Sequence, residues 1–106
     1  LKIHRFNCAG LDVHKNLIVA TIGITDKKTH VTEYIQKDFS SLNFDLYNLK
    51  NWLIEHECFD VCMESTGKYW FPVFNVLETE AKMNIVLVHP KSVSYTHLRA
   101  HETDSY

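Results

Sequence analysis

The sequence has no excess of positive charge, and this absence removes one class of protein. Its 106 residues include 11 Lys and Arg against 13 Asp and Glu, which gives a formal net charge of -2. Proteins that hold nucleic acid by charge need clustered basic residues, because phosphate contacts supply most of the affinity. The charge therefore argues against a stand-alone nucleic-acid binder, but not against a nuclease-type site in which metal ions meet the phosphate.

The sequence also lacks a cysteine framework and a long apolar run. Its three cysteines, Cys8, Cys58 and Cys62, are odd in number, and their spacing matches no disulfide framework or zinc motif. We expect buried free thiols in a reducing compartment. No apolar run reaches the roughly 18 residues of a membrane-spanning helix, and the N-terminus has no signal-peptide pattern. Together these absences predict a cytoplasmic protein without a membrane partner.

Hydrophobic patterning predicts five strands and two helices. Runs of apolar and β-branched residues predict strands at 7–12, 17–25, 30–37, 59–63 and 84–88. Leucines at helical spacing predict a first helix over 41–57, and a second is predicted over 68–81. The order βββαβαβ is that of the ribonuclease H-like fold, an α/β fold with a mixed sheet. Its first and fourth strands are neighbours at the sheet centre.

Local signals predict how the two helices begin. Ser40 is predicted as the N-cap of the first helix, with Phe39 and Phe44 as a hydrophobic staple. Pro72 is predicted to lie in the first turn of the second helix, where its missing N–H costs least.

Two acidic residues stand at the ends of the two predicted central strands. Asp12 ends the first strand, and Glu64 directly follows the fourth. Neighbouring strands are about 4.8 Å apart, so parallel pairing would bring both carboxylates to the same edge. Such a pair can share Mg²⁺ or Mn²⁺ ions that activate a water or a DNA 3′-hydroxyl for phosphodiester displacement. On spacing alone, solvation or helix capping explains an acid at a strand end better than a metal site does.

Residues beside the two acids have weaker claims to a role. Lys15 and Lys68 are candidate phosphate contacts, with solvation as an equal alternative. His14 either acts on the metal site through a neighbouring group or is a partly exposed turn histidine, which we favour. Ser65 and Thr66 are predicted to cap the second helix rather than to act as nucleophiles.

Three motifs carry a family resemblance: GLDVHK at 10–15, MESTGKYWFPVFNVLE at 63–78 and NIVLVHPK at 84–91. Over residues 8–92 the sequence resembles the N-terminal RuvC-like DEDD domain of IS110 insertion-sequence transposases, a family that includes Piv-type invertases. The resemblance implies DNA transposition by four acids that bind Mg²⁺ or Mn²⁺, with Asp12 as the first acid and Glu64 as the second. It also implies DNA and an element-encoded RNA as partners, and a homo-oligomer at full length.

The last segment is predicted to have a different origin. The string VSYTHLRAHET at 93–103 resembles a translated sequencing adapter, so we expect a partial domain over 1–92 and no domain over 93–106. This origin explains His97 and His101 without a metal site. The family's third and fourth acids would follow Lys91, where this segment stands, and Asp104 does not fit their pattern. We therefore expect a chain that is catalytically inactive alone.

Two other functions stay open at this point. One is a non-catalytic nucleic-acid-binding or assembly module with the same fold, which the near-neutral charge disfavours. The other is a RuvC-like junction resolvase, which would have the same two acids but no second domain.

Overall fold

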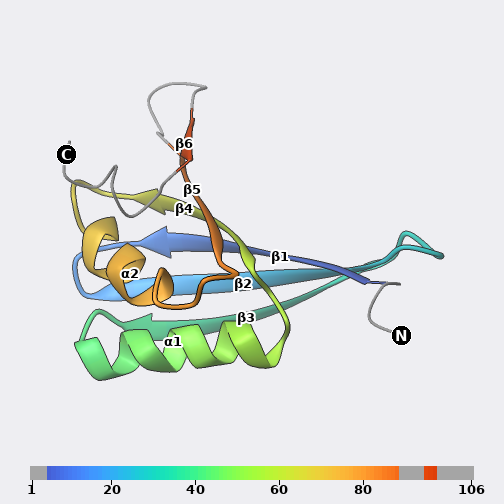
Figure 1. Ribbon diagram of the computed structural model, residues 1–106, viewed down its shortest axis with the longest axis horizontal. Coiled ribbons are helices and arrows are strands. Elements are labelled where there is room, and N and C mark those ends of the chain that lie inside the picture. The colour runs from blue at the N-terminus through green and yellow to red at the C-terminus, as the bar shows by residue number, and fades with distance from the viewer. Residues whose placement is uncertain (1–4, 89–94, 98–106) are drawn as a thin grey trace.

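The computed structural model describes residues 5–88 and 95–97, which form one mixed β-sheet with helices packed against it (Figure 1). The elements are β1 (Arg5–Val13), β2 (Leu17–Asp26), β3 (Thr32–Ser40), α1 (Asn43–Glu55), β4 (Asp60–Ser65), α2 (Trp70–Leu77), β5 (Asn84–Val88) and β6 (Tyr95–His97). The predicted βββαβαβ order is confirmed. The structure adds β6, which lies in the segment for which the sequence predicted no element.

The sheet topology places β1 and β4 side by side. Within the described residues the sheet has six strands in the order β3-β2-β1-β4-β5-β6. β1, β2 and β3 form an antiparallel meander, whereas β4 pairs in parallel with both β1 and β5. β6 pairs antiparallel with β5. The prediction of a ribonuclease H-like sheet, with the first and fourth strands adjacent at its centre, is confirmed.

Alternation along the strands gives the sheet one buried and one open face. On β1, Ala9, Leu11 and Val13 are buried, whereas Gly10 and Asp12 between them are exposed, as expected for side chains that alternate with period two. The buried strand residues form one core cluster with the inward residues of α1 and α2. Both described helices therefore cover the same face, and the residues that alternate with the core lie on the opposite face.

The start of α1 differs from the predicted one. The N-cap is Leu42, which makes no side-chain cap hydrogen bond, so the assignment of Ser40 was wrong. Instead the Ser40 N–H donates to Asp45 Oδ2 at 2.6 Å. Hydrogen bonds from Asn48 and then from Ser40 hold the pKa of Asp45 below its usual value. This stabilisation is complete above the unfolded pKa and is lost as the pH falls through the folded pKa.

The predicted hydrophobic staple is also absent. Phe44 is exposed, whereas Phe39 is buried and packs against Trp52 with ring centroids 5.5 Å apart. Phe39 belongs to β3, and its side chain is therefore directed by the strand and not by the helix that follows.

The turn between β4 and α2 corrects a second capping prediction. The N-cap of α2 is Tyr69, without a side-chain cap hydrogen bond. The Ser65 hydroxyl instead donates to the carbonyl oxygens of Thr66 at 3.2 Å and Gly67 at 3.5 Å. Gly67 has φ +59°, a left-handed conformation that glycine adopts without strain, and it separates Ser65 from the helix. Pro72 lies in the first turn of α2, as predicted.

The cysteines are free, but they do not share one environment. Cys58 is buried, and its burial raises the pKa of its thiol to about 12. Cys62 is half-buried and Cys8 is exposed, so the prediction of three buried thiols was wrong. The reason is the alternation of β1, which directs Ala9 into the core and Cys8 to the opposite face. Among residues 5–88 and 95–97, no helix has the length and hydropathy needed to cross a membrane.

Candidate metal centre

Asp12 and Glu64 are direct neighbours across two parallel strands. Asp12 on β1 pairs in register with Glu64 on β4. Glu64 lies inside β4, one residue before its end, and not after the strand as predicted. Both side chains are exposed, and both line one groove of about 470 Å³ on the open face of the sheet. The structure thus brings the two predicted acids together, at the ends of strands that point the same way.

The floor of this groove is formed by residues that alternate with the core. Gly10 precedes Asp12 by two residues and Cys62 precedes Glu64 by two, and these two residues pair with each other across β1 and β4. A Cβ atom at Gly10 would meet nothing within 4 Å, so the space beside the acids is open. Neither Gly10 nor Cys62 was predicted to lie at this site, although the period of two from each acid indicates both.

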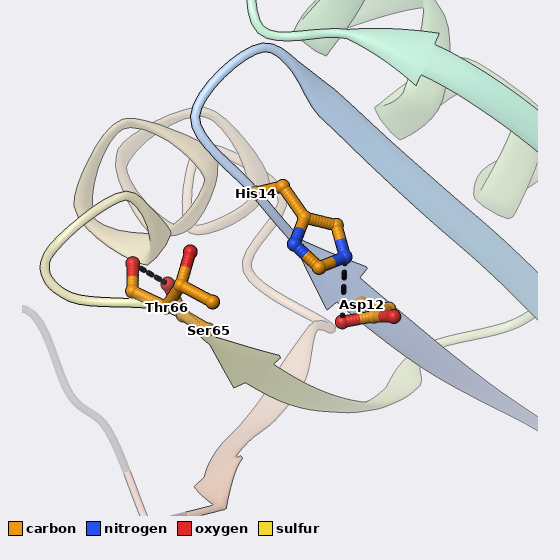
Figure 2. Close-up of polar contacts among 4 residues, drawn as sticks. All are labelled: Asp12, His14, Ser65 and Thr66. Carbon is orange, nitrogen blue, oxygen red and sulfur yellow. Dashed lines mark hydrogen bonds and ion pairs between the residues drawn. The ribbon is translucent and has the colours of Figure 1, made fainter.

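His14 faces the carboxylate of Asp12. Its Nε2 lies 3.2 Å from Asp12 Oδ1, with 43% of the His14 side chain and 55% of the Asp12 side chain exposed (Figure 2). The histidine is partly exposed, as predicted for the turn after β1. Its contact with the acid also fits the alternative interpretation, in which it acts through a neighbouring group.

The two candidate phosphate contacts lie where the strands that carry the acids end. Lys15 is exposed in the turn between β1 and β2, and Lys68 is exposed between β4 and α2. Both follow the acid of their own strand by three or four residues. Their contact with phosphate stays a prediction.

The donor chemistry of the pair suits a hard divalent cation. Carboxylate oxygens are preferred ligands of Mg²⁺ and Mn²⁺. Within the part of the chain that the structure describes, no group of three or more His, Cys, Asp or Glu side chains could hold a metal ion. The pair would thus supply part of a coordination shell. Residues 89–94 and 98–106, which include Asp104, lie outside the described residues, so the expectation of further acids after Lys91 stays untested.

A comparison with solved structures gives matches at low sequence identity. Two are Ppx/GppA proteins of Aquifex aeolicus, 12% and 13% identical, each with a TM-score of 0.56 and 81% of this chain covered. The chain spans 36% of the length of each of them. A third is Ciona intestinalis endonuclease V in complex with a 24mer DNA, with 12% identity, a TM-score of 0.35, and coverage of 83% of this chain and 47% of that one. The two Aquifex likenesses concern the fold alone.

No curated protein sequence matches the chain. A family model does match, over residues 9–105, and its description is transposase, of the IS110 DEDD type.

Proposed function

The chain belongs to the transposase family of the IS110 DEDD type, and from this membership we propose that Asp12 and Glu64 bind divalent metal ions for phosphodiester chemistry in DNA transposition. The single observation that carries the proposal is the parallel register of β1 and β4, which makes the two acids direct neighbours. Exposure of both carboxylates in one open groove lets a phosphodiester approach them. A junction resolvase would use the same acids, but family membership favours transposition.

Each residue of the site has a proposed part. Asp12 and Glu64 hold Mg²⁺ or Mn²⁺, and a bound ion supplies Lewis-acid stabilisation and an activated oxygen nucleophile. Lys15 and Lys68 are exposed beyond the two acids, where an ammonium group can neutralise a DNA phosphate. Open space above Gly10 leaves room for the scissile strand beside the carboxylates. DNA is the proposed substrate, and an element-encoded RNA and a homo-oligomer are proposed for the full-length protein on family membership alone.

Binding of Mn²⁺ at the acid pair tests this proposal directly. Addition of MnCl₂ to the isotope-labelled chain is expected to broaden the amide resonances of Asp12 and Glu64 first, because the paramagnetic ion lies nearest to them. Asp60, on β4 but at its opposite end, provides an internal control and is expected to broaden only at higher Mn²⁺ concentration. Equal broadening at every surface carboxylate, with no preference for the pair, contradicts the proposal.

The chain alone is expected to leave DNA uncut. Only two carboxylates of the described residues gather at the site, and a two-ion mechanism needs ligands that clamp both the attacking and the leaving oxygen. Supercoiled plasmid incubated with the chain and Mn²⁺ is therefore expected to stay supercoiled. The matched control is the double variant Asp12→Ala and Glu64→Ala, which excludes a contaminating nuclease. Nicking by the wild-type chain that this variant lacks would show that the site is complete.

A further inference from the structure

We propose that His14 is a positioning residue, which fixes the carboxylate of Asp12 for metal binding by donating an Nε2–H hydrogen bond to Oδ1. The inference rests on the proposed function, because it assigns a task at the same site. Its basis is the 3.2 Å contact between His14 Nε2 and Asp12 Oδ1. Figure 2 shows the imidazole directed at the carboxylate, from the chain segment that directly follows β1.

Two backbone hydrogen bonds restrain the chain at His14. The His14 N–H donates to the carbonyl oxygen of Leu17 at 2.8 Å, which closes the turn between β1 and β2. The carbonyl oxygen of Val13 accepts from the Thr66 N–H at 3.1 Å, which ties the end of β1 to the segment after β4. Both hydrogen bonds restrain the backbone from which the imidazole projects, so the ring starts from a fixed position beside Asp12.

The carboxylate gains orientation from this contact. The terminal torsion of an aspartate is broad, and an exposed carboxylate such as that of Asp12 is otherwise free to rotate. A hydrogen bond to Oδ1 selects one orientation and leaves Oδ2 available to a cation. Such outer partners of metal ligands are worth roughly 10–100-fold in metal affinity or activity. A neutral imidazole carries one hydrogen, so the contact requires that hydrogen on Nε2.

Three variants of the whole chain test the inference through the Mn²⁺ titration followed at the amides of the acid pair. His14→Ala is expected to weaken Mn²⁺ binding about tenfold, at the lower end of the range for outer partners. His14→Gln is expected to restore most of the affinity, because the amide nitrogen of glutamine can occupy the place of Nε2. His30→Asn removes an exposed histidine from the turn between β2 and β3 and is expected to change nothing. Asn tolerates the φ of 61° at that position.

Several outcomes overturn the inference. An unchanged Mn²⁺ affinity in His14→Ala would show that Asp12 binds the ion equally well without a hydrogen bond from His14. Equal weakness of His14→Ala and His14→Gln shows that the donated hydrogen bond is not the cause. A loss in both variants as large as that from Asp12→Asn makes His14 a metal ligand and not a positioning residue.

A metal-free measurement separates this inference from the proposed function. Nitrogen chemical shifts of the His14 ring report which nitrogen carries the hydrogen, and the Nε2–H form is expected. Replacement by Ala is expected to shift the carboxyl carbon of Asp12, whereas replacement by Gln is expected to keep most of the wild-type shift. If wild-type Mn²⁺ binding is not localised at the acid pair, the proposed function fails, yet these shifts still decide whether His14 holds Asp12. The Nδ1–H form overturns the inference.

Discussion

Glu64→Gln and Asp12→Asn are each expected to abolish localised Mn²⁺ binding while leaving the fold intact. Each substitution is close to isosteric and changes an exposed side chain of a paired strand, so the backbone ladder is not disturbed. Loss of either acid leaves a single exposed carboxylate, which binds a cation no better than any other surface acid. The expected loss exceeds about 100-fold, beyond the range for an outer partner of a ligand, and is measured by the same Mn²⁺ titration.

Asp38→Asn is the matched control for these variants. Asp38 on β3 pairs with Val19 of β2, and Val19 pairs with Asp12. Asp38 thus lies in the same row of the open face, two strands away, or roughly 10 Å at normal strand spacing. Its replacement is expected to leave Mn²⁺ binding unchanged. A loss equal to that of Glu64→Gln would place the cation elsewhere on the sheet.

The thermal unfolding temperature provides a second test of Mn²⁺ binding by Asp12 and Glu64. Without metal, two carboxylates directly opposite each other on neighbouring strands repel. Glu64→Gln and Asp12→Asn are therefore expected to be at least as stable as the wild-type chain in metal-free buffer. Saturating Mn²⁺ stabilises a protein that binds it in the folded state. The wild-type Tm is expected to rise with Mn²⁺, and this rise is expected to vanish in both variants.

The placement of the acid pair could be predicted from the sequence because topology fixes it. β1 and β3 run the same way because the meander reverses twice, and the α1 crossover from β3 brings β4 back in that direction beside β1. β1 and β4 therefore end at the same edge of the sheet. The bounds of β5, Asn84–Val88, coincide with the predicted ones, because the run is too short for a helix and rich in β-branched residues. The pairing of Asp12 with Glu64 depends on the order and direction of the strands, and not on the conformation of any turn.

The helix caps could not be predicted because strand pairing extends further than local signals indicate. Ser40 pairs with Leu17 as the last residue of β3, and Ser65 pairs with Val13 as the last residue of β4. Ladder pairing of the backbone therefore places both serines in strands, where a capping hydroxyl no longer reaches the first turn of the following helix. A serine caps a helix only if its backbone is not already paired in a sheet. Ser40 and Ser65 are both paired, so neither caps the helix that follows.

The contact of His14 with Asp12 has a signal in the sequence. Residues two apart at the end of a strand project to the same face, so an imidazole two residues after an acid starts close to it. The same period would have placed Cys8 on the open face with Asp12, and it explains why that thiol is exposed. The residues around the site therefore lie at steps of two from the acid on each strand.

Phe74→Ala is expected to destabilise the folded chain strongly. The Phe74 side chain on α2 is 1% exposed, and its ring meets that of Trp70 edge-on with centroids 6.3 Å apart. Truncation of such a buried ring typically costs about 3–5 kcal/mol, through lost burial and the cavity left behind. A small domain has a total stability of roughly 5–15 kcal/mol, so urea denaturation followed by circular dichroism should show a much lower midpoint.

Phe44→Ala provides the control for this prediction and links the packing of α2 to the candidate site. Phe44 is 66% exposed on α1, and loss of an exposed side chain usually changes stability by less than about 0.5 kcal/mol. Equal destabilisation by the two variants would mean that the core does not lie between α2 and the sheet. α2 packs over the face opposite the groove, and Phe74 does not line the groove, so its buried ring stabilises the fold without contacting the site. Loss of Phe74 is therefore expected to weaken Mn²⁺ binding only in proportion to the fraction of unfolded chain.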